Sequence, residues 1–573
     1  MKNLAWISAF FSAVLLLGSC RPADRPENKL VTYPIPASPV GFLADSALVV
    51  SAHPEATRIG VEILKRGGNA ADAAVAVHFA LAVCFPYAGN IGGGGFLVHR
   101  DEFGQISSLD FRETAPSAAH ENMYLDANGD VIQGKSVEGE LSSGVPGSVD
   151  GMWQLHQRHG SMEWTDLLTP AILLAEKGFL ATEQDAIWLE KFTDDFRRLN
   201  PRGPSLSKFG PWKAGDLLVQ PDLAQTLRRI QSHGREGFYQ GETAKLLVQQ
   251  MKAGNGIVDF NDLEGYKAEW RKPLALRFGD WALHTMPPPS AGGVVLIQSL
   301  QMLSKFPLAD WSSMDADYVH ATVEVLKRTF ADRNEFIGDP KFVDIPDFLL
   351  QRDYLSSRIA TINMEKATPS SEVGAGSWPE KEETTHFSIV DAKGSAISVT
   401  TTLNGPFGSK VWVQGAGFLL NNEMDDFSIR VGHANQFGLK GSKVNAIAPG
   451  KRMASSMTPT IITHQGKVSM VIGTPGGSTI PVSLLQCILH VYVHGLGMQQ
   501  AVAHRRFHHQ GFPDEIATED GAFPDEVWKK LVKRGHHVCL RDPIGRVNAI
   551  WVRPDGVMEA GADPRRDDCA GGF

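Results

Sequence analysis

Long apolar runs are nearly absent from this sequence of 573 residues. The one uncharged apolar stretch of note covers residues 4–17, and it is too short to cross a bilayer comfortably. No later segment offers a run of this kind. We therefore expect no membrane-spanning helix in the remainder of the chain.

Runs of basic residues are missing as well. The chain has 55 Lys and Arg against 64 Asp and Glu, and its formal net charge is -9. A protein that binds nucleic acid needs a basic stripe or patch, so we expect no nucleic-acid partner. With 43% hydrophobic and 21% charged residues, the composition is that of a globular protein with a large core.

Cysteine is scarce, with 5 residues in the chain. Four of them have spacings that fit no zinc pattern, namely Cys84, Cys487, Cys539 and Cys569. An oxidising compartment permits a Cys539–Cys569 disulfide, whereas buried free thiols are the simpler interpretation. His508 and His509, with His504 nearby, lack a Cys, Asp or Glu at a ligand spacing. We interpret them as structural and predict no metal and no cofactor.

The N-terminus has the pattern of a secretion signal. Lys2 precedes the apolar stretch, and Leu17-Gly18-Ser19-Cys20 resembles a bacterial lipobox, in which Cys20 carries the lipid. An ordinary cleaved signal peptide is the alternative. We predict a lipoprotein-type signal peptide at 1–20, a Pro-rich polar tether at 21–45, and a periplasmic or cell-surface protein that touches the membrane only through its anchor.

Helical patterns dominate the first two thirds of the chain. Residues 53–80 indicate two helices separated by a turn at 67–69, and the run 323–336 indicates an amphipathic helix. Residues 364–383 lack apolar periodicity and are dense in Glu, Ser, Pro and Gly. This composition is typical of an exposed loop.

After that loop the pattern changes to strands. Residues 384–390 and 395–403 flank a four-residue turn, so we expect a hairpin that places Thr384 opposite Thr401, within one residue of register. Residues 468–472 indicate another strand. A sharp loop at 473–477 follows, and Ser478 is the expected cap of the next helix.

A threonine between an exposed loop and a core strand has one chemical use. A hydroxyl is a poor nucleophile unless a base removes its proton. If the chain is cut before Thr384, the new α-amine, with a pKa of about 7.7–8, becomes a built-in base. By itself this pattern is more typical of ordinary β-propensity than of a nucleophile. We do not expect His386 to be the base, because adjacent side chains in a strand point to opposite faces.

Nine motifs in order over most of the chain resemble the γ-glutamyltransferase family of N-terminal-nucleophile hydrolases. The densest match is Thr-Thr-His-Phe-Ser at 384–388, which resembles the family's self-cleavage site. The other matching segments are 67–73, 110–113, 287–290, 331–333, 421–427, 455–460, 473–478 and 506–510.

The resemblance implies an α+β fold, a four-layer αββα sandwich, in a precursor that cleaves itself between Glu383 and Thr384. It implies a large subunit at 46–383 and a small catalytic subunit at 384–573, which stay together as a heterodimer. The implied activity is that of a γ-glutamyltransferase and glutathione hydrolase. The donors are glutathione and other γ-glutamyl compounds, and the acceptors are water, amino acids or dipeptides.

The resemblance also implies the roles of individual residues. Thr384 is the nucleophile, Thr402 holds it in place, and Gly476 and Gly477 supply the oxyanion hole. The substrate's α-carboxylate is bound by Arg112, Ser455 and Ser456. Its α-ammonium is bound by Asn404, Glu423 and Asp426. Such a zwitterion needs donors at one end and acceptors at the other.

Three positions depart from the common bacterial pattern. The stretch 431–442 resembles a lid loop, in which a tyrosine commonly latches the pocket, and Phe437 stands at the matching position. Glu423 replaces the glutamine of many bacterial members. Gly405 and Pro406 follow Asn404 and are unusual there. These differences leave hydrolysis and transpeptidation both open.

Two alternative functions are compatible with the sequence. A cephalosporin-type or poly-γ-glutamate acylase uses the same fold and nucleophile on another substrate. A lipid-anchored γ-glutamyl-peptide binding protein that never matures uses the pocket without the chemistry.

Overall fold

The computed structural model describes residues 40–573, apart from 202, 209, 374–383 and 431–441. The predicted signal peptide with Cys20, most of the tether, the cleavage-site residue Glu383 and the lid residue Phe437 therefore lie outside the described residues. Among the helices that are described, none is long and apolar enough to cross a membrane.

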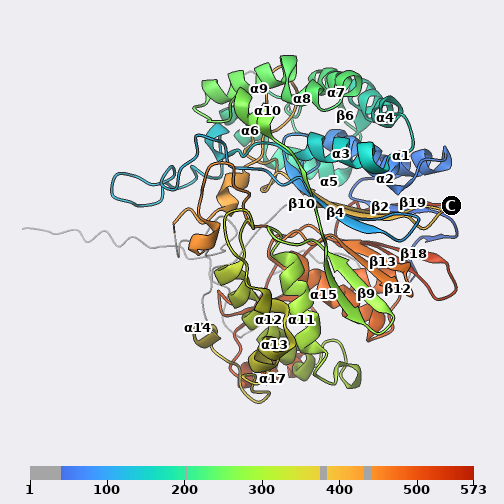
Figure 1. Cartoon of the computed structure of the whole chain (residues 1–573), viewed down its shortest axis with the longest axis vertical. Helices are drawn as coiled ribbons and strands as arrows, with labels where there is room; N and C mark the ends of the chain where they lie inside the picture. Colours follow the sequence, from blue (N-terminus) through green and yellow to red (C-terminus); the bar gives the residue numbers. More distant parts are fainter. Residues whose placement is uncertain (1–39, 202, 209, 374–383, 431–441) are drawn as a thin grey trace, which may run out of the picture.

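Two seven-stranded sheets form the centre of the molecule (Figure 1). The first sheet has the order β1 (Leu43–Ala44), β18 (Met558–Ala562), β17 (Asn548–Val552), β13 (Lys467–Gly473), β12 (Thr460–His464), β9 (Trp281–Thr285) and β8 (Leu274–Phe278). The second has the order β19 (Cys569–Gly572), β2 (Leu48–Ser51), β10 (Thr384–Val390), β11 (Ala396–Thr402), β3 (Gly94–Arg100), β4 (Ile106–Asp110) and β7 (Glu269–Arg271).

The two sheets pack face to face through aliphatic side chains. Val50, Val98 and Val390 of the second sheet join Ile461 and Val471 of the first in one buried cluster. Strand β10 has the sequence Thr-Thr-His-Phe-Ser-Ile-Val, and every residue of it is buried. Because successive side chains of a strand alternate between faces, the even-numbered positions from 384 to 390 face the opposite sheet.

Helices of the first half of the chain cover the outer face of the second sheet (Figure 1). They are α1 (Pro54–Lys65), α2 (Ala70–Cys84), α3 (Ser148–His159), α4 (Trp164–Lys177), α5 (Glu183–Lys191), α6 (Thr193–Leu199), α7 (Pro221–His233), α8 (Glu236–Tyr239), α9 (Gly241–Ala253) and α10 (Phe260–Gly265). Helix α2, almost entirely small and apolar, is buried along its whole length, and Phe387 and Ile389 of β10 share its core.

A second group of helices covers the outer face of the first sheet (Figure 1). They are α11 (Gly292–Leu303), α12 (Ala316–Phe336), α13 (Arg352–Ile359), α14 (Ser370–Val373), α15 (Thr479–Tyr492), α16 (Met498–Ala503) and α17 (Asp525–Lys533). The order helix, sheet, sheet, helix confirms the predicted four-layer αββα sandwich.

The remaining elements are short. Two small sheets contain β5 (Phe179–Leu180) with β6 (Leu217–Leu218), and β14 (Phe507–His508) with β15 (Ile516–Thr518) and β16 (Val538–Leu540). The 3₁₀ turns are η1 (Glu140–Ser142), η2 (Leu308–Asp310), η3 (Asp347–Leu350), η4 (Glu423–Asp426) and η5 (Lys443–Asn445).

Several local predictions need correction. The helix expected at 323–336 is α12, which begins at Ala316 and is buried on nearly all sides rather than amphipathic. Part of the loop expected to be exposed is not: Ala367 and Ser370 are buried, and α14 lies within it. Cys84 and Cys487 are buried free thiols, as predicted, whereas Cys569 is free but only partly buried, so the Cys539–Cys569 disulfide is not formed. The expectation of a free thiol is wrong for Cys539, which is disulfide-bonded.

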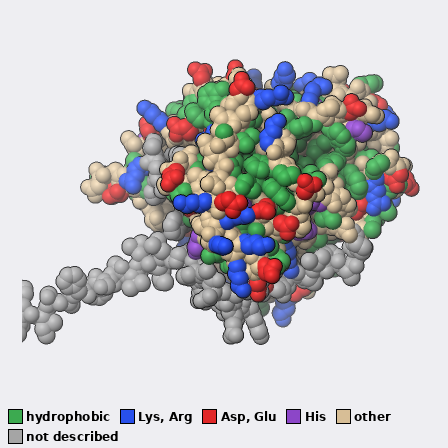
Figure 2. Space-filling view, turned by 90° about the horizontal axis from the view of Figure 1, so that it is seen from below, with side chains coloured by type: hydrophobic (Ala, Val, Ile, Leu, Met, Phe, Trp, Pro, Cys, Tyr) green, Lys and Arg blue, Asp and Glu red, His purple; other side chains and the backbone are tan. Residues whose placement is uncertain are grey.

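Charges are mixed on the face of the molecule seen from below. Figure 2 shows Lys and Arg interspersed with Asp and Glu on this face, while hydrophobic side chains gather in a hollow. The basic stripe that a nucleic-acid ligand needs is not present on the face drawn there.

Gly473, the last residue of β13, touches the strand that begins at Thr384. A Cβ atom at position 473 would lie 2.2 Å from Cε1 of the buried His386 ring. We predict that Gly473→Ala destabilises the protein by ~1–3 kcal/mol through overpacking, seen as a lower thermal unfolding midpoint. Gly265→Ala is the control, because a Cβ atom at that position would meet nothing within 4 Å. Equal midpoints for the two variants would contradict this packing.

Candidate active site

Thr384 lies at the start of β10 with a threonine directly across from it. The register pairs Thr384 with Thr402 and Val390 with Ala396, one residue away from the register expected from the turn length. Ser395 belongs to the turn, because its amide donates to Oδ1 of Asp391 at 2.9 Å. Thr402 Oγ1 accepts a hydrogen bond from the amide of Asn404 at 2.7 Å. The two threonines are thus neighbours at one end of the central sheet.

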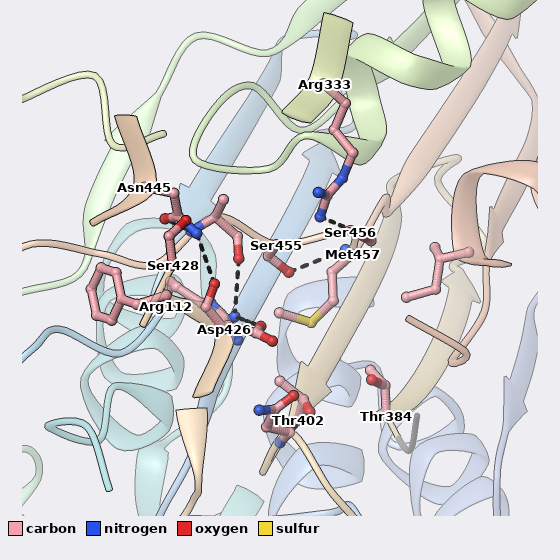
Figure 3. Close-up of a pocket in the computed structure, with 14 residues that line it drawn as sticks. Arg112, Arg333, Thr384, Thr402, Asp426, Ser428, Asn445, Ser455, Ser456 and Met457 are labelled. Atoms are coloured by element: carbon pink, nitrogen blue, oxygen red, sulfur yellow. Dashed lines mark hydrogen bonds and ion pairs between the residues drawn. The ribbon is translucent and has the colours of Figure 1, made fainter. Parts of the chain in front are cut away.

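Most of the predicted site residues line a single pocket. Thr384 and Thr402 lie at one end of it, while Arg112 and Asp426 lie at another side (Figure 3). The predicted residues that line it are Arg112, Thr384, Thr402, Asn404, Asp426, Ser455 and Ser456. They come from loops and strands that are as far apart in the sequence as residues 112 and 456. The fold therefore brings together groups that the resemblance assigned to one ligand.

Arg112 follows β4 and is held between two carboxylates. Its Nη1 donates to Oε2 of Glu423 at 2.5 Å, and its Nη2 donates to Oδ2 of Asp426. Its backbone is fixed as well, because its amide donates to Oδ1 of Asp110 and the Tyr266 hydroxyl donates to its carbonyl. The side chain is 1% exposed, so the guanidinium charge is balanced almost entirely by protein carboxylates.

A third carboxyl group joins this cluster. Glu113 Oε2 lies 3.6 Å from Arg112 Nη1, and neither Glu113 oxygen has a hydrogen-bond partner among the described residues. Burial raises the pKa of Glu113 to about 8, against the opposing attraction of Arg112. Burial also raises the pKa values of Glu423 and Asp426, again opposed by Arg112. One guanidinium thus faces more acidic groups than it can neutralise.

Asn404 stands in a tight loop that connects β11 to the acidic residues. Its backbone has a φ of 77°, a left-handed conformation that Asn tolerates better than most residues. Its Nδ2 donates to the carbonyl of Asn422 at 3.0 Å, and the amide of Gly405 donates to Asn422 Oδ1. Asn422 immediately precedes η4, so these bonds fix the position of Glu423 relative to β11.

Ser455 and Ser456 present their hydroxyl groups to the pocket. Ser455 Oγ accepts from the amide of Met457 at 3.2 Å. Ser456 Oγ accepts from Nη2 of Arg333 at 3.2 Å. Arg333 reaches this serine from the last turn of α12 and lines the same pocket (Figure 3). The segment 331–333 matched a family motif, but its sequence assigned no role to this arginine.

Gly476 and Gly477 form the sharp loop between β13 and α15. Their φ values are 129° and 53°, a region that side-chain-bearing residues rarely adopt. Within the described part of the chain, neither of their amides donates a hydrogen bond, and Ile480 of the next helical turn lines the pocket. Ser478 precedes α15, but its hydroxyl donates to Gln510 Oε1 and does not cap the helix.

The reason given for excluding His386 as the base is wrong. Thr384 and His386 are two residues apart and lie on the same face of β10. The ring nitrogens of His386 are within 2.9 Å of Thr400 Oγ1 and 3.1 Å of Ser388 Oγ. Burial lowers the pKa of His386 to about 3. The ring is therefore a neutral packing element.

The described residues contain one group of metal-type ligands, and it is not the histidine run at 508–509. His320, Glu324 and His536 lie together in the second helical layer. Both Glu324 oxygens are already engaged, by Arg328 and by the amide of Thr368. His320 Nδ1 lies 2.6 Å from His536 Nε2. The protein's own groups satisfy this cluster, so its geometry gives no reason to add a metal.

The geometry of the pocket agrees with what related sequences indicate. A model of the family described as gamma-glutamyltranspeptidase matches residues 56–573. The chain belongs to the gamma-glutamyltranspeptidase family. It is 44% identical over 531 residues to a glutathione hydrolase proenzyme of Pseudomonas sp. (strain A14), covering 92% of each chain.

Solved structures of similar proteins have the same fold. The cephalosporin acylase from Bacillus halodurans aligns with a TM-score of 0.82 at 25% identity, covering 95% of this chain and 99% of that one. A chain of the Helicobacter pylori gamma-glutamyltranspeptidase aligns with a TM-score of 0.56 at 40% identity, covering 59% of this chain and 97% of that one. The α+β sandwich is thus shared by proteins that are named for different substrates.

The protonation of Glu113 provides a test of the buried cluster. Its pKa is raised in the folded protein, so the folded state binds the proton more tightly than the unfolded state. Stability is therefore lost as pH rises from the usual glutamate range to about 8. We predict that Glu113→Gln, which cannot lose a proton, gains thermal stability over the unmodified protein as pH rises through this window. The gain should vanish at pH 4.

Thermal unfolding midpoints measured from pH 4 to pH 9 check this prediction. Glu121→Gln is the matched control, because Glu121 is exposed and its substitution should not change the pH profile. Parallel profiles for Glu113→Gln and the unmodified protein would show that Glu113 is already ionised at neutral pH.

Proposed function

We propose that this protein is a self-processing γ-glutamyltransferase and glutathione hydrolase. One observation carries the proposal: Thr384 opens a buried strand at a pocket where a guanidinium is held between two carboxylates. The far end of a γ-glutamyl group carries one carboxylate and one ammonium. That pocket offers both complementary charges, and a nucleophile lies across from them. The similarity to a glutathione hydrolase proenzyme supports this choice of substrate.

The first chemical event is a cut between Glu383 and Thr384. The hydroxyl of Thr384 attacks the Glu383 carbonyl carbon, the peptide bond to the Thr384 nitrogen breaks, and the Glu383 acyl group becomes an ester on Thr384 Oγ. Water then hydrolyses this ester. The product is a free α-amine on Thr384, which has the right pKa to remove the hydroxyl proton at neutral pH. Thr402, whose Oγ1 is already oriented by the amide of Asn404, steadies the nucleophile.

In turnover, Thr384 Oγ attacks the γ-carbonyl carbon and its proton passes to the α-amine. The developing oxyanion lies against the amides of Gly476 and Gly477, which have no other acceptor within the described residues. The carbon–nitrogen bond then breaks, and the leaving amine takes the proton. Water hydrolyses the resulting ester to release glutamate. An amino acid or dipeptide that attacks instead gives the transpeptidation product.

The zwitterion binds by exchanging partners. Without substrate, Arg112 pairs directly with Glu423 and Asp426. When the ligand binds, its carboxylate contacts Arg112, Ser455 and Ser456. Its ammonium then pairs with Glu423 and Asp426 and contacts Asn404. The protein thereby replaces an internal ion pair by two intermolecular ones, so neither charge of the ligand binds well without the other.

The two fragments would remain one molecule after the cut. The first sheet takes β1, β8 and β9 from the segment before residue 384, and β12, β13, β17 and β18 from the segment after it. Sheet two mixes the segments in the same way. The share of this chain covered by the H. pylori polypeptide corresponds to the length of residues 46–383, which supports a two-chain mature form.

The location of the protein is part of the proposal. The basic start, the apolar stretch and the lipobox-like Cys20 support export with a lipid anchor. The predicted tether at 21–45 ends too late, because Leu43 and Ala44 form β1 of the first sheet, so only the part ahead of β1 would separate the anchor from the fold. With such an anchor, the pocket would lie in the periplasm or at the cell surface.

Two threonines side by side allow a matched test of processing. Thr384 faces the pocket, whereas Thr385 points to the other face of β10 and its hydroxyl has no partner among the described residues. We predict that Thr384→Val abolishes both chain cleavage and turnover of a γ-glutamyl anilide. Thr385→Val should retain both within a few fold, because it keeps the shape of the side chain.

Intact mass spectrometry and anilide turnover measure the two effects. The unmodified protein should give two fragments broken between Glu383 and Thr384. A single uncut chain that binds γ-glutamyl peptides without turnover would favour the unprocessed binding protein. Cleavage that persists in Thr384→Val would rule out Thr384 as the processing nucleophile.

A cephalosporin-type acylase is the second candidate, favoured by the fold match to the Bacillus halodurans enzyme. The charged pocket separates the two. If the pocket selects an α-amino acid end, L-glutamate should compete with the anilide at least ~10-fold better than glutarate, which lacks the ammonium. Inhibition constants for both compounds measure this ratio. Equal inhibition, together with faster turnover of a glutaryl amide, would favour the acylase.

A further inference from the structure

Arg333 is a second buried guanidinium at the pocket. It comes from the last turn of α12 and is 8% exposed, and its Nη2 donates to Ser456 Oγ at 3.2 Å (Figure 3). Its Nη1 donates to Asn334 Oδ1. Arg333 lies beyond the two serines when viewed from Thr384, at the opposite end of the pocket from the nucleophile (Figure 3). It therefore lies on the side of the pocket where the proposed function places the α-end of a γ-glutamyl group.

The neighbouring residue keeps this turn of α12 in place. Asp332 accepts hydrogen bonds from Gln298 Nε2 at 3.0 Å and from the Tyr354 hydroxyl at 2.7 Å. It also pairs with Arg358 at 2.9 Å. These contacts join α12 to α11 and α13, so Arg333 projects from a fixed backbone. A positioning role requires such rigidity.

The contact with Arg333 determines what Ser456 can do. A hydroxyl has one proton to donate and two lone pairs. Because the guanidinium can only donate, Ser456 Oγ must accept, and its proton remains available. Ser456 Oγ makes no other hydrogen bond among the described residues and lines the pocket. Arg333 thus leaves Ser456 as a donor toward the pocket.

Arg333 also balances the charge of the site. Arg112 pairs with Glu423 and Asp426 and lies near Glu113, and Arg333 brings a second guanidinium to this acidic site. Arg333 is close enough to Asp426 to favour its ionised form. A site with one positive charge fewer would repel the α-carboxylate of the incoming substrate.

We propose that Arg333 is a positioning residue that makes the enzyme specific for donors with an α-carboxylate, by orienting the hydroxyl of Ser456 and supplying the second positive charge. This inference rests on the proposed function and adds a residue and a selection rule to it. The selected feature is the α-carboxylate itself, so a 4-aminobutyryl amide, which lacks only that group, should be insensitive to Arg333.

The test compares two anilides that differ only in the α-carboxylate, γ-glutamyl anilide and 4-aminobutyryl anilide. We expect Arg333→Gln to lower kcat/KM for the γ-glutamyl anilide by ~10–100-fold, mostly through KM, because a hydrogen bond to a charged group is lost. For the 4-aminobutyryl anilide, kcat/KM should change less than about twofold. Arg333→Lys keeps a charge and a donor, and should recover part of the loss.

A double-substitution cycle tests whether Arg333 acts through Ser456. If it does, Arg333→Gln in a Ser456→Ala background should add much less loss than it causes alone. Arg352→Gln, an exposed arginine at the start of α13, is the control and should leave both substrates unaffected. Intact mass confirms that each variant is fully processed. If Arg333→Gln does not mature, Arg333→Lys is compared on the same two anilides.

The outcomes separate the inference from the function on which it rests. Equal losses on both anilides, or fully additive losses in the cycle, would overturn the role of Arg333 while leaving the activity intact. Absence of γ-glutamyl turnover in the fully processed unmodified protein would instead overturn the proposed function.

Discussion

The pairing of β10 with β11 is the constraint on which the site depends. Strand β10 lies third in a seven-stranded sheet, with β2 on one side and β11 on the other. Its first residue is fixed by the same ladder of backbone bonds as the rest of the strand. The register puts Thr402 across from Thr384, and Asn404 then turns toward η4. A shift of one residue would turn every side chain of β10 to the wrong face.

The second organising element is the buried ion cluster around Arg112. Burying an isolated charge is costly, so a guanidinium at this depth requires carboxylates, and those carboxylates require it. In the structure the members of the cluster pair with one another, and under the proposed function the same groups pair with the two charges of an amino acid. Loops from both halves of the chain supply it, which makes it dependent on the complete sandwich.

The local sequence predicts the hairpin, the turn at 67–69 and the Gly-rich loop before α15, because each depends on residues that are close together in the sequence. The register agrees with the prediction to within the one residue allowed, and Thr402 rather than Thr401 faces Thr384 because the carboxylate of Asp391 holds Ser395 in the turn. The pairing of Arg112 with Glu423 and Asp426 was not predicted, because opposite charges were assigned to a ligand rather than to each other. Arg333 was missed as well, since its partner lies 123 residues away in sequence. Only tertiary structure shows such a contact.

Each of the two sheets contains strands from both sides of residue 384, and this arrangement affects how long the folded protein persists. An uncut chain folds in a single-molecule process, whose equilibrium does not depend on concentration. Once cut, the same structure consists of two polypeptides, and regaining it after unfolding is a second-order encounter between fragments that each lack strands of both sheets. The proposed cut would thus make folding a one-time event. The lifetime of the cut protein would then be set by the height of its unfolding barrier rather than by an equilibrium constant.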